Sequence, residues 1–167
     1  MSVGGGEVVA LLGENGAGKS TLIKILAGVY SPDSGAIAYR GQDMTHATRR
    51  MPVSFIHQDL GLIDWMTVTE NICLTLGHSR RFGLIEWGWA RKRAARALAK
   101  LGADIDPDLR IQDLSRTEKS LVAIARALMT DAEILVLDEP TASLPADEVA
   151  RLFDALRRLR AQGVGMI

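Results

Sequence analysis

A glycine-rich run near the N-terminus has the residue types and the spacing needed to bind phosphate. Gly13–Ser20 reads Gly-Glu-Asn-Gly-Ala-Gly-Lys-Ser, which fits the pattern Gly-x-x-x-x-Gly-Lys-Ser/Thr. Glycines allow the backbone to curl so that several N–H groups face one anion, and a helix that starts there adds its partial positive charge. Lys19 can reach the β- and γ-phosphates of a nucleotide, and the Ser20 hydroxyl can hold Mg²⁺. The run predicts a nucleotide triphosphate site; the alternative is a glycine-rich turn followed by a chance Lys-Ser pair.

Two adjacent carboxylates later in the chain are candidates for the chemistry of hydrolysis. Asp138 and Glu139 follow Ile134–Leu137, an apolar run typical of a strand buried on both faces of a parallel sheet. Open parallel sheets bind ligands at the carboxyl ends of their strands, so Asp138 is expected beside the glycine-rich loop as a support for Mg²⁺. Glu139 is a candidate general base for the attacking water. Standing alone, the pair would fit a solvated turn as well.

Gln58 is a further candidate because it follows a second strand candidate, Val53–His57. Its amide has the chemistry to contact Mg²⁺ or the attacking water. From chemistry alone, however, a surface glutamine is the better interpretation.

The elements around these residues alternate between strands and helices. Val8–Leu12 predicts a buried parallel strand before the loop, and the apolar spacing after it predicts a helix that ends at Gly28. Capping boxes predict helices that begin at Thr67, running to about Leu76, and at Ser115. A strand is expected over 36–40, and a last helix is expected to have Pro145 in its first turn and to stop at Gly163. A helix is also expected over 86–101, with one side formed by Trp89, Ala94, Ala97, Leu98 and Leu101.

This order predicts an α/β fold, in which a P-loop nucleotide triphosphatase core with a mostly parallel sheet carries an inserted helical subdomain. We expect one domain over 1–167, with 1–58 and 131–167 as the nucleotide-binding core and 59–130 as the helical subdomain. The sequence ends where another strand is expected to begin, so we interpret the chain as a truncated domain.

Composition restricts the classes of partner. The chain has 167 residues, and its 20 basic and 20 acidic side chains cancel, so no overall field favours nucleic acid. The basic run Arg91–Arg93, with Arg96 and Lys100, is interpreted as a solvated helix face rather than a nucleic-acid site. The single cysteine, Cys73, excludes an intrachain disulfide, and its apolar neighbours favour a buried structural thiol over a nucleophile.

With these residues in order, the chain resembles the ATP-binding subunits of ABC transporters over nearly its whole length. Gly13–Ser20 followed by Thr21 resembles the Walker A loop, and Gln58 matches the glutamine of the Q-loop. Ile134–Asp138 resembles Walker B, and Glu139 matches the catalytic glutamate. Leu114–Ser115 at the head of a helix is a more specific match. Segments 14–22 and 81–85 resemble the importers of ribose, xylose and related monosaccharides, in which two such domains commonly lie in tandem, and this chain resembles the first.

The resemblance implies a role for each matching residue. It implies that Glu139, Gln58 and Lys19 are catalytic and that Ser20, Gln58 and Asp138 hold Mg²⁺. It implies that ATP is bound by Gly13, Asn15, Gly16, Ala17, Gly18, Lys19, Ser20 and Thr21, and across a dimer by Ser115.

The function implied by the resemblance is an ATP-binding and ATP-hydrolysing subunit that energises a sugar importer. It would lie at the cytoplasmic face of the inner membrane as a peripheral protein. Its partners would be a second nucleotide-binding domain, a transmembrane permease and, indirectly, a periplasmic sugar-binding protein, and not nucleic acid. Two alternatives remain: a non-catalytic nucleotide-binding switch, and a soluble ABC ATPase outside transport.

Three departures from the family pattern bear on this function. The signature sequence, usually Leu-Ser-Gly-Gly-Gln, reads Leu-Ser-Arg-Thr-Glu at Leu114–Glu118. Arg116 and Thr117 are expected to add bulk where the backbone should approach the opposite nucleotide, and a pure capping box at Ser115 stays open as an alternative. Ala142–Pro145 lacks the aspartate that usually ends the D-loop.

The third departure is that the switch histidine and the adenine-stacking aromatic of the family are expected outside 1–167. We therefore expect this chain by itself to hydrolyse ATP weakly. In the family, the region after Gln58 contacts the permease, so an exposed apolar docking patch is expected from Leu60, Leu62, Ile63 and Trp65.

Overall fold

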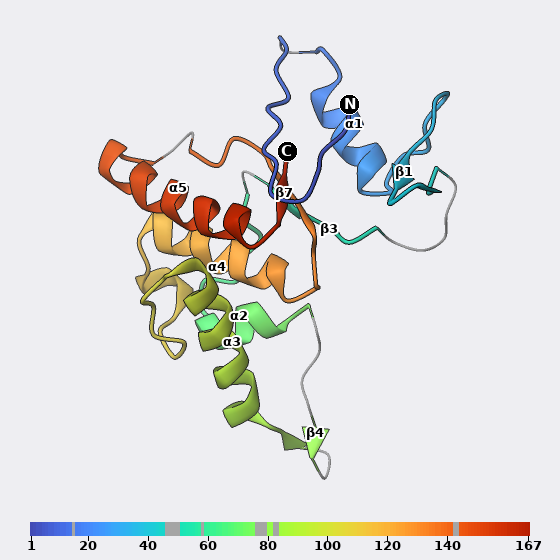
Figure 1. Cartoon of the computed structure of the whole chain (residues 1–167). Coiled ribbons are helices and arrows are strands. Elements are labelled where there is room, and N and C mark those ends of the chain that lie inside the picture. The colour runs from blue at the N-terminus through green and yellow to red at the C-terminus, as the bar shows by residue number, and fades with distance from the viewer. Residues whose placement is uncertain (15, 46–50, 58, 76–79, 82–83, 142–143) are drawn as a thin grey trace.

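A parallel sheet forms the centre of the molecule. The computed structural model describes residues 1–14, 16–45, 51–57, 59–75, 80–81, 84–141 and 144–167. Within them the sheet has the order β3 (Val53–Ile56), β6 (Ile134–Leu137) and β7 (Gly165–Met166), with parallel pairing throughout. A parallel bridge between Val8 and Met166 adds the chain before the glycine-rich loop to the other side of β7 (Figure 1).

The sequence of β6 explains its central place in this sheet. Leu135 and Val136 are buried, and the strand pairs with a neighbour on each side. A parallel strand covered on both faces needs a continuous apolar run, which Ile134–Leu137 supplies. The predicted strands at 53–57 and 134–137 and the mostly parallel sheet are confirmed, with β3 ending one residue early at Ile56.

The buried strand expected over Val8–Leu12 is wrong. Val8 forms a single bridge, and the Val9 N–H donates to the Met166 carbonyl at 2.9 Å. Val8 is 58% exposed and Leu12 is 88% exposed. Because β7 ends at Met166, the ladder in the described part of the chain reaches no further than Val9. An apolar sequence is buried only where a neighbouring strand and a covering helix meet it.

Helices and two short antiparallel ribbons complete the described structure. The helices are α1 (Lys19–Leu26), α2 (Val68–Cys73), α3 (Trp87–Leu101), α4 (Arg116–Leu128) and α5 (Ala146–Ala161), with a 3₁₀ turn, η1, at Ile111–Asp113. The ribbons are β1 (Ala38–Tyr39) with β2 (Gln42–Asp43), and β4 (Arg80–Arg81) with β5 (Leu84–Ile85). Figure 1 shows α4 between α5 and the pair α2 and α3, while α1 and the β1–β2 ribbon lie apart from them. None of the described helices is long and apolar enough to cross a membrane.

The two predicted capping boxes are both present. The Thr67 hydroxyl accepts from the Glu70 N–H at the start of α2, and the Glu70 carboxylate accepts from the Thr67 N–H at 2.7 Å. Ser115 forms the same box at the start of α4. Helix α2 ends at Cys73, and Leu76, to which it was expected to extend, lies outside the described residues. Pro145 is the N-cap of α5 rather than part of its first turn.

A single hydrophobic cluster joins the helices to the sheet. Its members come from β3, α2, α3, α4, β6, α5 and β7, and include Ile56, Ile72, Leu98, Ile124, Leu135, Leu152 and Met166. The residues expected to form a helical subdomain therefore share a core with the sheet. The division into 1–58 with 131–167 and 59–130 stays a prediction.

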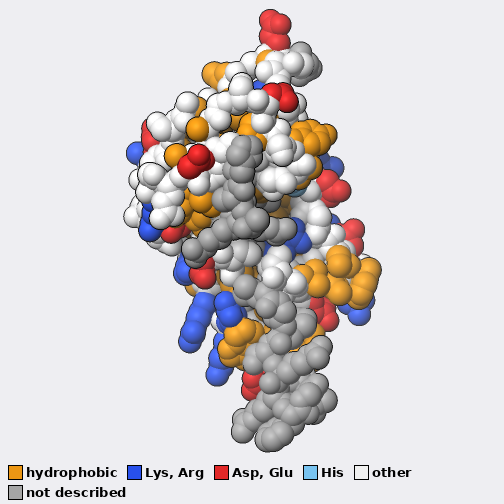
Figure 2. Space-filling view, turned by 90° about the vertical axis from the view of Figure 1, so that its right-hand side faces the viewer, with side chains coloured by type: hydrophobic (Ala, Val, Ile, Leu, Met, Phe, Trp, Pro, Cys, Tyr) orange, Lys and Arg blue, Asp and Glu red, His pale blue; other side chains and the backbone are white. Residues whose placement is uncertain are grey.

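The basic face of α3 is solvated, as its sequence indicates. Arg91, Lys92, Arg96 and Lys100 are exposed, and Arg91 pairs with Asp108 at 2.7 Å. Figure 2 shows basic side chains beside hydrophobic surface in the lower part of the molecule, where α3 lies. Trp89 was expected on the buried side, but it is 38% exposed and lies under the Arg93 guanidinium, 4.6 Å from the ring centroid.

Cys73 is buried, as predicted, and we expect it to be chemically inert in the folded chain. Its side chain is fully covered and its thiol faces the Ala90 carbonyl at 3.7 Å. Burial raises the pKa of the Cys73 thiol, and the thiolate is the reactive form. A thiol reagent at mildly alkaline pH should label the native chain at least about 100-fold more slowly than the denatured chain. Equal labelling rates would contradict this burial.

Candidate functional site

The glycine-rich loop adopts a conformation that requires glycine. Gly16 has φ 88° and Gly18 has φ 90°, values in the left-handed region that side chains disfavour. Gly13 is favoured for a different reason, because an added Cβ would lie 3.0 Å from the Ala17 Cβ and would push one of the two aside. The Ala17 N–H donates to the Glu14 carbonyl at 3.1 Å and closes the turn. Asn15 lies outside the described residues.

Helix α1 begins directly after this loop with an uncapped N-terminus. Gly18 is its N-cap, and no side chain of the described residues caps its first turn. Helices α2 and α4 carry capping boxes, whereas α3 and α5, like α1, have no side-chain cap among the described residues. The first N–H groups of a helix have no partner inside it, and here they belong to Lys19, Ser20 and Thr21. Ser20 and Thr21 are exposed, so the helix end can receive an anion from solvent.

Lys19 folds back over the loop. Its ammonium group donates to the Gly13 carbonyl at 2.6 Å and to the Glu14 carbonyl at 3.0 Å. The lysine charge is thus held beside the backbone that would surround a phosphate.

Asp138 and Glu139 lie at the carboxyl end of β6, as the sequence predicts. The Asp138 N–H donates to the Ile56 carbonyl of β3 at 2.9 Å, which ties its backbone to the sheet. Asp138 is partly buried and Glu139 is exposed. Glu139 has φ 47°, a left-handed conformation that is uncommon for a residue with a side chain and is found preferentially at functional sites.

A pocket of about 190 Å³ opens at this acidic pair. Its walls come from the end of β3 and the segment after it, from α4, from the end of β6 with the loop after it, and from Leu152 of α5. The polar side chains among its lining residues are His57, Arg116, Lys119, Ser120, Asp138 and Glu139.

The sheet directs the chain that leads into the loop, and the strand that leads into the acidic pair, toward the same edge. Val8 pairs with β7, and β7 pairs with β6, in parallel in both cases. The carboxyl ends of the chain at Val8 and of β6 therefore point the same way with one strand between them. Neighbouring strands lie about 4.8 Å apart, so the two backbones are separated by about 10 Å.

The signature segment is held by its own capping box. The Ser115 hydroxyl accepts from the Glu118 N–H at 3.2 Å, and the Ser115 N–H donates to the Glu118 carboxylate at 2.8 Å. A hydroxyl has one proton to donate besides the lone pairs with which it accepts. The capping role of Ser115 therefore leaves its O–H proton for another acceptor.

Arg116 and Thr117 were expected to add bulk where the backbone should approach the opposite nucleotide, but the side chain of Thr117 points into the protein. Thr117 is fully buried, and both its hydroxyl and its N–H donate to the Glu148 carboxylate on α5. As the second residue of α4, it turns its side chain toward the neighbouring helix rather than outward. Arg116 is exposed, as expected.

Gln58 lies outside the described residues, but the segment that follows it is well tied down. Arg126 on α4 donates to the Leu60 carbonyl at 2.6 Å and to the Gly61 carbonyl at 2.7 Å. Burial lowers the pKa of Arg126, since desolvation disfavours its charged form. These two bonds join the region after Gln58 to the signature helix.

A buried amide fixes the next turn of the same segment. Asn71 on α2 is fully buried, accepts from the Ile63 N–H at 2.8 Å and donates to the Ile63 carbonyl at 3.1 Å. Among the four residues of the expected docking patch, Trp65 is 66% exposed, whereas Leu60, Leu62 and Ile63 are partly buried. Only Trp65 of the expected patch is exposed, and Leu60 and Leu62 pack against the core instead.

Three residues that hold these segments were not predicted from the sequence: Arg126, Asn71 and Glu148. One signal was available for Arg126, since it is a polar residue inside a largely apolar helical run, whereas Asn71 follows Thr69 and Glu70 in α2 and stands out less. A polar side chain at such a position needs hydrogen-bond partners. Glu148 lies in an ordinary first helical turn, and its sequence context carries no such signal.

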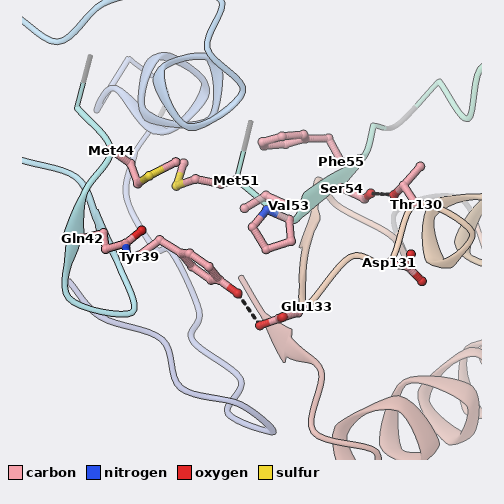
Figure 3. Close-up of a pocket in the computed structure, with 11 residues that line it drawn as sticks. Tyr39, Gln42, Met44, Met51, Val53, Ser54, Phe55, Thr130, Asp131 and Glu133 are labelled. Carbon is pink, nitrogen blue, oxygen red and sulfur yellow. Dashed lines mark hydrogen bonds between the residues drawn. The ribbon is translucent and has the colours of Figure 1, made fainter. Parts of the chain in front are cut away.

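A larger pocket, of about 740 Å³, lies at the opposite end of β3 and β6. Figure 3 shows Tyr39 donating to Glu133 there, at 2.5 Å, and Ser54 beside Thr130. The hydrogen bond to Glu133 raises the pKa of Tyr39. Arg40 also pairs with Glu133 at 2.8 Å, so this carboxylate joins the β1–β2 ribbon to the start of β6.

Comparison with known proteins identifies the family. The ABC transporter family model matches residues 1–142, and the chain belongs to this family. Among curated proteins, a ribose import ATP-binding protein of Rhizobium meliloti strain 1021 is 46% identical over 166 residues, which are 97% of this chain and 33% of that protein. The chain thus spans about a third of the length of the curated relatives it matches.

Solved structures agree with this assignment. The chain is similar to cbiO1 of Clostridium perfringens, part of the ABC transporter complex cbiONQ, with a TM-score of 0.83 and 30% identity over 100% of this chain and 67% of that one. It is also similar to an ATP-binding cassette in a dimeric post-hydrolysis state bound to ADP and Pi, with a TM-score of 0.76 and 26% identity over 99% of this chain and 75% of that one. The predicted α/β nucleotide-binding fold is therefore confirmed.

Proposed function

We propose that this chain is the ATP-binding and ATP-hydrolysing part of a subunit that energises an importer for a sugar. The observation that carries the proposal is the uncapped N-terminus of α1 behind a loop with left-handed Gly16 and Gly18. A phosphate needs this combination of inward N–H groups and a positive helix end. The family assignment and the ribose-import relative support a nucleotide as the ligand and a sugar as the cargo.

The residues of the loop would hold the nucleotide through its phosphates. Gly13–Thr21, including Asn15, would bind with backbone N–H groups, and the Lys19 ammonium would move from the carbonyl oxygens of the loop to phosphate oxygens. Mg²⁺ would enter with the nucleotide and be held by the Ser20 hydroxyl, with Asp138 and Gln58 as its further supports.

Hydrolysis would be carried out at the carboxyl end of β6. When bound, Mg-ATP supplies the γ-phosphoryl group that is transferred to water. Glu139 would accept a proton from that water, for which its exposure leaves room. Gln58 would contact the water or the metal and report the state of the γ-phosphate toward the permease.

A second cassette would complete the site. Ser115 would offer its free O–H proton to the γ-phosphate held by the opposite domain, supplied by a second copy or a tandem domain. One similar cassette is dimeric in its post-hydrolysis state, which supports this arrangement. The other partners would be a transmembrane permease and, through it, a periplasmic sugar-binding protein, with the chain peripheral to the cytoplasmic face of the inner membrane.

One observation favours a second candidate, a nucleotide-binding switch that does not turn ATP over. The Thr117 N–H, one of the backbone groups at the head of α4, already donates to Glu148. The signature segment, Leu114–Glu118, therefore has one backbone N–H fewer that could bind a phosphate of the opposite cassette.

The test is phosphate release from Mg-ATP at increasing concentrations of this chain. A site shared between two copies predicts a rate per chain that rises with protein concentration, at a level below that of complete transporter subunits. Binding of Mg-ATP without phosphate release at any concentration would favour the switch. A rate per chain that is high and independent of concentration would contradict the shared site.

A further inference from the structure

The first turns of α4 and α5 are joined by one carboxylate. A single oxygen of Glu148, Oε2, accepts from the Thr117 hydroxyl at 2.5 Å and from the Thr117 N–H at 3.2 Å. Thr117 is completely buried, and Glu148 is partly buried. Because water cannot reach Thr117, both of its donors depend on this oxygen.

The position of the carboxylate suits its charge. Thr117 is the second residue of α4, and Glu148 is the third residue of α5. The negative group thus lies at the N-terminal ends of two helices, where the partial positive charge of each helix stabilises an anion. No side-chain cap of α5 is found among the described residues, and Glu148 is one of two acidic residues, with Asp147, in the first turn of this helix.

The same carboxylate links two parts of the proposed machinery. Thr117 is two residues from Ser115, and the capping box with Glu118 fixes Ser115 on the same turn. Helix α5 begins at the end of the loop that starts with Asp138 and Glu139. Glu148 therefore connects two segments. One is the signature segment with Ser115, which would face a second cassette, and the other is the loop that begins with Asp138 and Glu139.

Neither partner belongs to the nucleotide-binding loop. Residues 13–20 make their described hydrogen bonds within the loop and α1. A change in the Thr117–Glu148 pair should therefore leave nucleotide binding by the chain's own loop intact, while it disturbs the surface that meets another cassette.

We propose that Glu148 is a positioning residue which, through Thr117, sets where Ser115 is presented to the nucleotide of the opposite cassette. This inference rests on the proposed function. It explains why a threonine is accommodated at the place of a signature glycine: its side chain is the inner partner of the Glu148 carboxylate.

The test compares variants of this chain in two measurements. Calorimetric titration of Mg-ATP reports the loop of the chain itself, and phosphate release at high protein concentration reports the shared site. Thr117→Val keeps the shape and removes the hydroxyl donor, Glu148→Ala removes the acceptor, and Thr117→Ser keeps the donor. Asp154→Ala, which removes an exposed ion pair with Arg157 on the same helix, is the matched control.

The expected result is a split between the two measurements. Thr117→Val and Glu148→Ala should each lower phosphate release about tenfold while the Kd for Mg-ATP changes less than about twofold. The double variant should be no slower than the slower single variant, because both remove the same contact. Thr117→Ser and Asp154→Ala should behave as the original chain.

Several results would overturn the assignment. Full phosphate release by Glu148→Ala, or additive losses in the double variant, would contradict the assignment alone. Reaction of Cys73 with a thiol reagent in Glu148→Ala would mean that this variant is partly unfolded. The milder Glu148→Gln and Thr117→Val variants then replace it in the test. Their Kd for Mg-ATP must equal that of the original chain. A parent chain that binds Mg-ATP but releases no phosphate at any concentration, or that binds none, would contradict the proposed function and this assignment with it.

Discussion

Replacing Lys19 with alanine should abolish measurable binding of Mg-ATP. The Lys19 ammonium is held between the Gly13 and Glu14 carbonyl groups, at 2.6 Å and 3.0 Å, which is within reach of any phosphate that enters the loop. A hydrogen bond between charged groups contributes about 1.5–3 kcal/mol. Loss of the contacts to two phosphates should therefore raise the Kd by about 100-fold or more, measured by calorimetric titration of Mg-ATP into the chain.

The matched control for this prediction is Lys24→Ala. Lys24 lies on the same helix, is exposed and contacts the Tyr30 ring, with 5.4 Å between its Nζ and the ring centroid. Its removal takes away the same charge without touching the loop, so the Kd should stay close to that of the original chain. Equal loss in both variants would mean that net charge, and not the loop, governs affinity. Full binding by Lys19→Ala would refute the loop as the phosphate site.

Glu139→Gln should trap ATP. Glutamine has nearly the same size as glutamate and should leave the left-handed backbone at position 139 unchanged, but it cannot accept the proton of the attacking water. General bases contribute about 10²–10⁴-fold to rate, so phosphate release should fall by at least about 100-fold while Mg-ATP binding is retained. The measurement is the ratio of ATP to ADP in the bound nucleotide after a single-turnover incubation, together with the rate of phosphate release.

Glu133→Gln provides the comparison for Glu139. Glu133 immediately precedes β6, is exposed and binds Tyr39 and Arg40. It lies at the opposite end of the strand from Asp138, so its replacement should leave phosphate release unchanged. An unchanged rate in Glu139→Gln would remove this residue as the base and favour the nucleotide-binding switch.

Local sequence rules predicted the parts of the site that depend on near neighbours. The capping box at Ser115 involves a residue three positions away, and it is present as predicted. The glycine pattern predicted a loop with a curled backbone, and Gly16 and Gly18 have the left-handed φ that only glycine adopts without strain. The apolar run Ile134–Leu137 predicted a strand with the acidic pair at its carboxyl end, because a strand buried on both faces needs an unbroken apolar sequence.

The same rules failed where burial depends on distant residues. Val8–Leu12 has the composition of a buried strand, yet Leu12 is 88% exposed because the described ladder ends at Val9. Leu60 and Ile63 were expected at the surface, but they lie partly buried because Arg126 and Asn71 hold their backbone against the helices. Composition indicates that a segment prefers burial, but packing determines which surface covers it.

The sequence by itself determined the nucleotide-binding character of this protein, since the loop, its lysine and the acidic pair are recognisable from residue types and short spacings. Only the tertiary structure decided how the signature segment is held. Thr117 and Glu148 are 31 residues apart, and Arg126 and Gly61 are 65 residues apart. No local propensity selects such partners. They are selected when helices pack on a shared core and each buried donor must find an acceptor in the place where packing has put it.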